Sequence, residues 1–186
     1  MKADVIVPGI SAIEADMIAL RRQIHAHPEL GFQEQVTSDL VADRLLEWGY
    51  RVTRGLGKTG VVGTLTTGAG RSIGLRADMD ALPIREASGV PHASRIDGVM
   101  HACGHDGHTA MLLAAARHLA ETRAFTGTLN VIFQPAEEGL GGARAMLDDG
   151  LFEQFPCDAV FAMHNVPGYP EGQFGILSGP SMASAD

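Results

Sequence analysis

Short apolar strands alternate with amphipathic helices along most of the sequence, and this alternation constrains the fold more than any other feature. Strand-forming residues bounded by glycines predict strands at 50–53, 60–66, 72–76, 127–134, 158–163 and 173–177. Apolar residues at three- and four-residue spacing, together with runs of good helix formers, predict helices at 11–27, 37–48, 106–121 and 141–149. Ser11 and Asp106 are the expected N-caps of the first and third helices. The pattern indicates a layered α/β fold with a largely parallel sheet.

Composition excludes several classes of protein. With 186 residues, 45% of them hydrophobic and 19% charged, the chain can bury a real core and is not disordered. No apolar run approaches the 18 or more residues that a membrane-spanning helix needs, and a net charge of −8 disfavours binding to nucleic acid. Two cysteines and an N-terminus without a long apolar segment predict a reducing, cytoplasmic location.

Polar side chains follow three of the predicted strands, at the point where each strand ends. The sequences are RADMD (76–80), QPAEE (134–138) and MHN (163–165). In open α/β sheets, ligands bind outside the carboxyl ends of the strands. The sequence therefore predicts a functional site at this edge of the sheet.

The segment MHACGHDGHT (100–109) precedes the third predicted helix and carries possible metal ligands. Cys103 and His105 are separated by one residue in a glycine-containing turn, so their side chains can converge on one point. Thiolate sulfur and imidazole nitrogen are favoured ligands of zinc and similar ions. A single Cys-x-His is more often a buried cysteine beside a hydrogen-bonded histidine. Three histidines and one cysteine within eight residues favour a metal site instead.

Glu137 and Glu138 follow an apolar strand and precede a glycine turn. Adjacent residues on an extended backbone point to opposite sides, so one carboxylate could bind a metal while the other acts as a general base. An acidic pair can also form a solvated face or begin a helix. His164, at the end of another strand, completes a possible ligand set with Cys103, His105 and Glu138.

Asp78 and Asp80 lie two residues apart, on one face of an extended segment. A carboxylate near a metal-bound histidine commonly accepts the second ring N–H and fixes the tautomer. Either aspartate could have this role, and either could instead cap the turn that follows.

Four sequence blocks, HPELGF, RADMDALP, HACGHDGHT and QPAEEG, occur in this order between Leu20 and the C-terminus. Together they resemble the amidohydrolase branch of the aminoacylase and carboxypeptidase clan of metallopeptidases, which includes the hippurate hydrolases. The resemblance implies a three-layer α/β/α catalytic domain with a mixed, mostly parallel sheet, a dinuclear metal site and an inserted lid domain. Position by position, it implies that Glu137 is the general base and Asp80 a catalytic carboxylate. The implied metal ligands are Cys103, His105, Glu138 and His164.

The function that the resemblance implies is hydrolysis of the amide bond of N-acyl amino acids such as hippurate. One or two divalent ions (zinc, manganese, nickel or cobalt) would activate water, and Glu137 would accept its proton. The implied partners are a small-molecule substrate and further copies of the full-length chain, in a homodimer or larger assembly, without nucleic acid or membrane.

Chains of this family continue well beyond 186 residues. The resemblance therefore implies that residues 1–186 are the N-terminal part of the catalytic domain, that the lid would begin near residue 180, and that the lid is absent. We expect the 186-residue chain alone to hold at most about one metal ion, to associate and to be inactive. The alternative is a non-catalytic metal-binding α/β domain.

Overall fold

A computed structural model of the chain describes residues 7, 9–170, 172–176 and 178–179. The helices are α1 (Ile10–Ala26), α2 (Gln35–Glu47), α3 (His105–Thr122), α4 (Gly142–Asp148) and the short α5 (Leu151–Gln154). The strands are β1 (Arg51–Leu56), β2 (Gly60–Thr66), β3 (Ser72–Asp78), β4 (Thr128–Gln134) and β5 (Ala159–Ala162). Within these residues, no helix is both long enough and apolar enough to cross a membrane.

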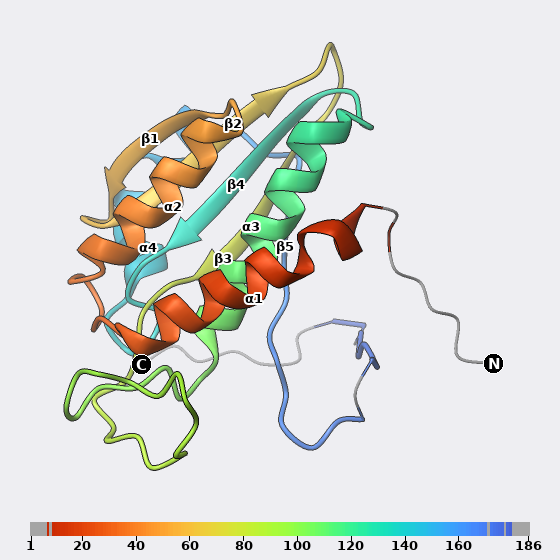
Figure 1. Cartoon of the computed structure of the whole chain (residues 1–186). Coiled ribbons are helices and arrows are strands. Elements are labelled where there is room, and N and C mark those ends of the chain that lie inside the picture. The colour runs from red at the N-terminus through yellow and green to blue at the C-terminus, as the bar shows by residue number, and fades with distance from the viewer. Residues whose placement is uncertain (1–6, 8, 171, 177, 180–186) are drawn as a thin grey trace.

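The strands form one mixed sheet in the order β1-β2-β4-β3-β5 (Figure 1). β3 pairs in parallel with β4 and with β5, whereas β2 is antiparallel to both β1 and β4. Four of the five strands therefore run in one direction and β2 runs in the other. The prediction of a mixed α/β sheet is confirmed.

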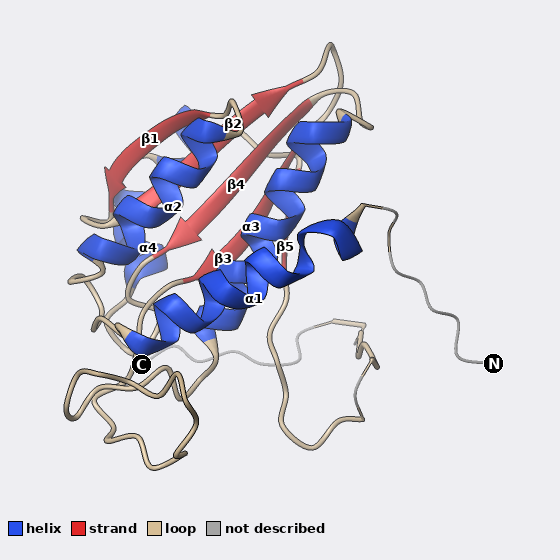
Figure 2. Ribbon diagram, in the orientation of Figure 1, coloured by secondary structure: helices blue, strands red, loops and turns tan. Residues whose placement is uncertain are grey.

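Helices cover both faces of the sheet. α1, α2 and α3 lie on one face, and α4 lies on the other (Figure 2). The buried side chains of the central strands alternate accordingly: Val131 and Phe133 of β4 join the core beneath α1–α3, whereas Ile132 packs with Met146 of α4. This two-residue period buries both faces of the sheet and produces three layers.

Three local predictions are wrong. Residues 173–176 form a loop instead of a strand, and the side chains of Phe174 and Ile176 are 78% and 93% exposed. Among the described residues, no neighbouring strand pairs with this segment. Leu177 and the predicted lid boundary near residue 180 lie outside the described residues. α1 begins after Gly9, so Ser11 lies inside the helix. α3 begins at His105 after Gly104, which has a left-handed conformation with φ 91°, so Asp106 is not its N-cap.

β5 is an edge strand that is exposed along its whole length, including the side chains of Val160 and Phe161. Exposed apolar edge strands pair with other chains. We expect the purified chain to form oligomers as its concentration rises, and Phe161→Lys to shift them toward monomer in sedimentation velocity experiments. Val36→Lys, at an exposed apolar site on α2, is the matched control. Equal effects of the two substitutions would contradict an association through β5.

Candidate metal centre

The predicted site residues come together at the carboxyl ends of the parallel strands. Asp78 ends β3 and Asp80 follows it, Glu137 and Glu138 follow β4, and His164 follows β5. Cys103 and His105 reach the same edge from the N-terminus of α3, where Gly104 turns the chain sharply. The structure therefore brings the predicted residues together at one end of the parallel strands.

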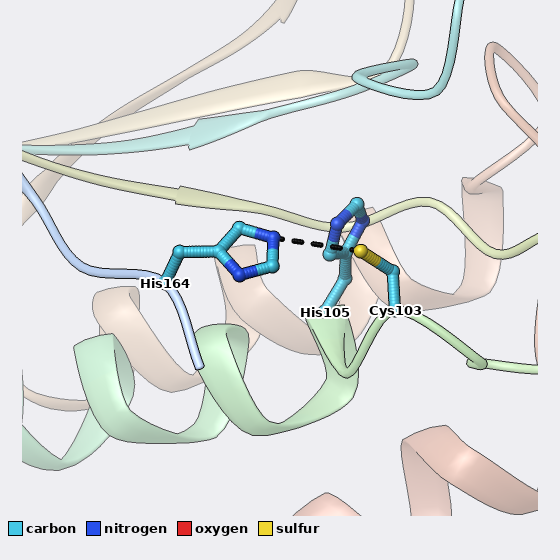
Figure 3. Close-up of side chains that lie close together, drawn as sticks. All are labelled: Cys103, His105 and His164. Carbon is cyan, nitrogen blue, oxygen red and sulfur yellow. Dashed lines mark hydrogen bonds between the residues drawn. The ribbon is translucent and has the colours of Figure 1, made fainter. Parts of the chain in front are cut away.

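Cys103, His105 and His164 surround one point (Figure 3). Each offers a ligand atom, and these three atoms lie within 4.8 Å of one another. The distance from Cys103 Sγ to His164 Nε2 is 3.4 Å. His164 Nδ1 donates a hydrogen bond to the carbonyl oxygen of Asn165 at 2.7 Å, so the unprotonated Nε2 faces the thiol.

The orientation of His105 is fixed by Asp80. His105 Nδ1 lies 3.2 Å from Asp80 Oδ1, and because an ionised carboxylate only accepts, Nδ1 carries the proton. Nε2 is thereby directed toward the centre, where it is buried and has no hydrogen-bond partner among the residues that the structure describes. The other oxygen of Asp80 accepts the backbone N–H of Glu138 at 3.0 Å. Asp80 thus connects the histidine to the segment that carries the two glutamates.

Both glutamates approach the same atom. Glu137 Oε2 and Glu138 Oε1 each lie 3.8 Å from His105 Nε2. The prediction that they face opposite sides is wrong, because the extended backbone of β4 ends at Gln134 and Ala136 adopts a left-handed conformation with φ 49°. The two differ in exposure: the Glu137 side chain is 39% exposed and that of Glu138 is 26% exposed.

A divalent ion fits this arrangement. His105 Nε2 and Glu138 Oε1 are both buried and lie 3.8 Å apart, and within the described part of the chain neither has a hydrogen-bond partner. Buried polar atoms without partners are costly and rare. Zinc binds nitrogen and oxygen ligands at about 2.0–2.2 Å, so one ion can bridge two atoms up to roughly 4 Å apart. The two unpaired atoms therefore have the spacing of metal ligands.

The charge balance of the site also favours a cation. Burial raises the pKa of the Cys103 thiol to about 12, and the negative charges of Glu138, Glu137 and Asp78 add to the effect. A coordinated metal ion reverses this balance, because thiol ligands bind in the deprotonated form. Metal uptake should therefore release a proton from Cys103.

Asp78 and His108 are already satisfied by hydrogen bonds. His108 Nδ1 donates to Asp78 Oδ1 at 2.7 Å, and its Nε2 accepts the backbone N–H of Asn165 at 3.1 Å. Arg76 donates to the second oxygen of Asp78 at 2.8 Å. Of the two aspartates that the sequence left open, Asp80 contacts His105 most closely and Asp78 instead anchors His108.

Asp78 should make folding stability depend on pH. Burial opposes its ionisation, but the hydrogen bond from His108 and the charges of His105 and Arg76 prevail and lower its pKa to about 2. Because this folded pKa lies below the usual value of 3.8, its contribution of about 2 kcal/mol is present above pH 4 and is lost as the pH falls through 2.

Urea unfolding of the metal-free wild type and Asp78→Asn between pH 2 and 6 tests this expectation. The stability advantage of the wild type should shrink toward acid. Asp97→Asn, which removes an exposed carboxylate, serves as the control and should show little pH dependence. A wild-type advantage that is the same at pH 2 and pH 6 would contradict the assignment.

The structural roles of two buried carboxylates, Asp106 and Glu34, were not predicted from the sequence. Asp106 accepts hydrogen bonds from His25 at 2.9 Å and from Arg21 at 3.0 Å, and so ties α3 to α1. Glu34 is fully buried and contacts the backbone just before Glu137. Its place two residues after the HPELGF block was the available signal.

The fold, together with this cluster of possible metal ligands, is that of an α/β domain of the metallopeptidase class. Residues 74–179 match the family described as peptidase family M20/M25/M40, and the chain belongs to this family.

Two named proteins and one solved structure are also similar to this chain. The chain is 53% identical over 182 residues to the hippurate hydrolase of Campylobacter jejuni, covering 97% of this chain and 47% of the relative. It is 42% identical over 180 residues to the N-acetyl-L-cysteine deacetylase of Bacillus subtilis, covering 96% and 43%. The solved structure of the Bacillus subtilis YXEP protein, a dinuclear metal-binding peptidase of the M20 family, is similar with a TM-score of 0.86 and 43% identity, covering 91% and 48%. The chain thus spans about half the length of these relatives.

Proposed function

We propose that this chain supplies the metal centre of a hydrolase that cleaves the amide bond of N-acyl amino acids. The observation that carries the proposal is the pair of unpartnered buried atoms, His105 Nε2 and Glu138 Oε1, beside Cys103 and His164. The family and the names of the two relatives, a hippurate hydrolase and an N-acetyl-L-cysteine deacetylase, support the substrate class.

Cys103, His105, Glu138 and His164 would hold one or two divalent ions. Thiolate and imidazole suit zinc, and the carboxylates also suit manganese; nickel and cobalt accept the same mixed set. Three groups of possible ligands share His105, namely Cys103–His105–His164, His105–Glu137–Glu138 and Asp78–His105–His108. The similar Bacillus subtilis structure is a dinuclear metal-binding peptidase, which supports a centre with two ions.

Glu137 would move the proton in the reaction. A bound divalent ion would supply Lewis acidity, which lowers the pKa of water toward about 7. Glu137, the more exposed of the two glutamates, would take the proton from the attacking water and return it to the leaving amine. Asp80 would hold the ring of His105 and the backbone of Glu138 in place during these steps.

The test joins this chain to the part of a relative that it does not cover. A chimeric enzyme, in which these residues replace the matching segment of the Campylobacter jejuni hippurate hydrolase, should bind zinc or manganese and hydrolyse hippurate or another acyl amino acid. A folded chimera that binds metal and hydrolyses none of a panel of acyl amino acids would instead support the non-catalytic alternative. Absence of metal binding would overturn both.

Asp80→Asn should lower metal affinity or activity by about 10–100-fold, because the amide cannot fix the His105 tautomer as a carboxylate does. Metal affinity is measured on the 186-residue chain by competition with a chelator. Asp43→Asn, at an exposed position of α2, is the control. Unchanged affinity and activity would remove the supporting role of Asp80.

The remaining proposals concern partners and location. Both cysteines are free thiols, which supports a reducing compartment, and we place the protein in the cytoplasm. The acidic net charge supports a small-molecule substrate and no nucleic-acid partner. The exposed edge strand β5 supports assembly with further copies of the chain, in a homodimer or a larger oligomer.

A further inference from the structure

Glu34 is a fully buried carboxylate on the segment between α1 and α2. Its Oε1 accepts the backbone N–H of Ala136 at 2.8 Å, and its Oε2 accepts the hydroxyl of Thr59 at 2.6 Å. No Lys, Arg or His in the described part of the chain forms an ion pair with it. Burying a carboxylate without a cation costs free energy, so the buried position of Glu34 needs an explanation.

Capping of α2 is not that reason. Although Glu34 occupies the N-cap position, its side chain makes no capping hydrogen bond. Glu29 does this instead, because its carboxylate accepts the backbone N–H groups of Val36 at 3.0 Å and Thr37 at 2.8 Å. The Glu34 side chain points away to the turn that follows β4.

That turn has a conformation that needs external support. Ala136 has φ 49°, a left-handed conformation that is unfavourable for a residue with a side chain. Its carbonyl oxygen accepts the N–H of Gly142 at 2.9 Å, and Gly31 packs so closely that an added Cβ would lie 3.0 Å from the Ala136 side chain. The next two residues along the chain are Glu137 and Glu138.

We infer that Glu34 is a positioning residue, which holds the Ala136 amide so that Glu137 and Glu138 face His105. Two buried carboxylates then fix the turn from its two sides, Glu34 at the N–H of Ala136 and Asp80 at the N–H of Glu138. Without Glu34 the strained turn can relax, and the unpartnered oxygen of Glu138 moves away from His105 Nε2. This inference rests on the proposed metal centre.

Co²⁺ binding to the 186-residue chain, followed by absorption spectroscopy, tests the inference. Glu34→Ala should lower Co²⁺ affinity by about 10–100-fold, the range seen when groups that orient ligands are removed. The charge-transfer band of the Cys103 thiolate should persist while the d–d bands change, because Glu138 is displaced and Cys103 is not. Glu34→Gln should restore affinity to within a few-fold of the wild type, since its amide oxygen can still accept the Ala136 N–H.

A second readout is independent of metal. Exchange of the Ala136 amide hydrogen, followed by NMR in the metal-free chain, should accelerate in Glu34→Ala and remain slow in Glu34→Gln. Glu29→Ala is the matched control: it removes a carboxylate of comparable hydrogen bonding from the same segment and should lower stability without changing Co²⁺ affinity. If Glu34→Ala does not fold, Thr59→Val, which removes the other partner of Glu34, should weaken Co²⁺ binding and accelerate Ala136 exchange to a smaller extent.

The possible results distinguish the positioning role of Glu34 from the metal centre itself. Wild-type affinity and spectrum in folded Glu34→Ala, or in Thr59→Val if the first variant is unfolded, would overturn the positioning role and leave the metal centre intact. An equal loss of affinity in Glu29→Ala would overturn it as well, since the effect would then be general destabilisation. A wild-type chain that binds no Co²⁺ would overturn the metal centre, and the positioning role with it.

Discussion

Replacing Glu137 with glutamine is expected to lower the rate of hippurate hydrolysis by about 10²–10⁴-fold in the chimeric enzyme, while metal binding remains nearly unchanged. The amide of glutamine cannot accept the proton of the attacking water. Glu137 is the more exposed of the two glutamates, which suits a residue that meets solvent and substrate. Steady-state kinetics and metal stoichiometry, measured on the same preparation, give the two quantities.

The neighbouring glutamate, Glu138, is expected to respond differently to the same substitution. Glu138→Gln should lower metal occupancy together with activity, whereas Glu153→Gln, on the surface of α5, should change neither. Glu137 and Glu138 lie equally far from His105 Nε2, so the distances alone do not assign their roles. A loss of metal in Glu137→Gln with metal retained in Glu138→Gln would show that the roles are exchanged.

Replacing Cys103 with alanine should lower the metal affinity of the 186-residue chain by more than about 100-fold. This exceeds the roughly 10–100-fold effect of removing groups that only orient ligands, because a ligand atom is lost. Cys103 Sγ lies 3.4 Å from His164 Nε2, so His164→Ala should have a similar effect. Metal affinity is measured by competition with a chelator, and stoichiometry by elemental analysis.

Cys157→Ala is the matched control for the thiol. Cys157 is also partly buried, but it contacts Asn130 and the backbone of Phe155 near the beginning of β5, at the opposite end of the strands. Its removal should leave metal affinity unchanged. If Cys103→Ala bound metal as tightly as Cys157→Ala, Cys103 would not be a ligand.

Much of the fold follows from local patterns. The predicted helices at 11–27 and 141–149 lie within a residue or two of α1 and α4, because their apolar spacing and flanking glycines are local signals. The 173–177 prediction failed because strand formation depends on a partner, which a local pattern does not reveal. α5 is a single short turn after Gly150 and lacks a periodic signal of its own.

The site was predictable where the chemistry is local and not where it depends on conformation. Cys103, His105 and His164 are conspicuous residue types at strand and helix ends, and the structure brings them together. The direction of the Glu137 side chain depends on the left-handed backbone of Ala136, and alanine gives no signal for that conformation. Glu34 lies 102 positions from the amide that it contacts, a separation that no local pattern spans.

Because β2 runs in the reverse direction, the loops at the two ends of the strands differ in how much change in length they tolerate. Since β1 runs with the parallel strands, the turn between β1 and β2 lies at the edge with the metal centre, where Thr59 contacts Glu34. The loop at 67–71, between β2 and β3, lies at the opposite end of the strands from the metal centre, where Gly68 has open space around it. Insertions, peptide tags and fluorescent labels are therefore compatible with the tip of this loop at Gly68, whereas the β1–β2 turn has to keep its length.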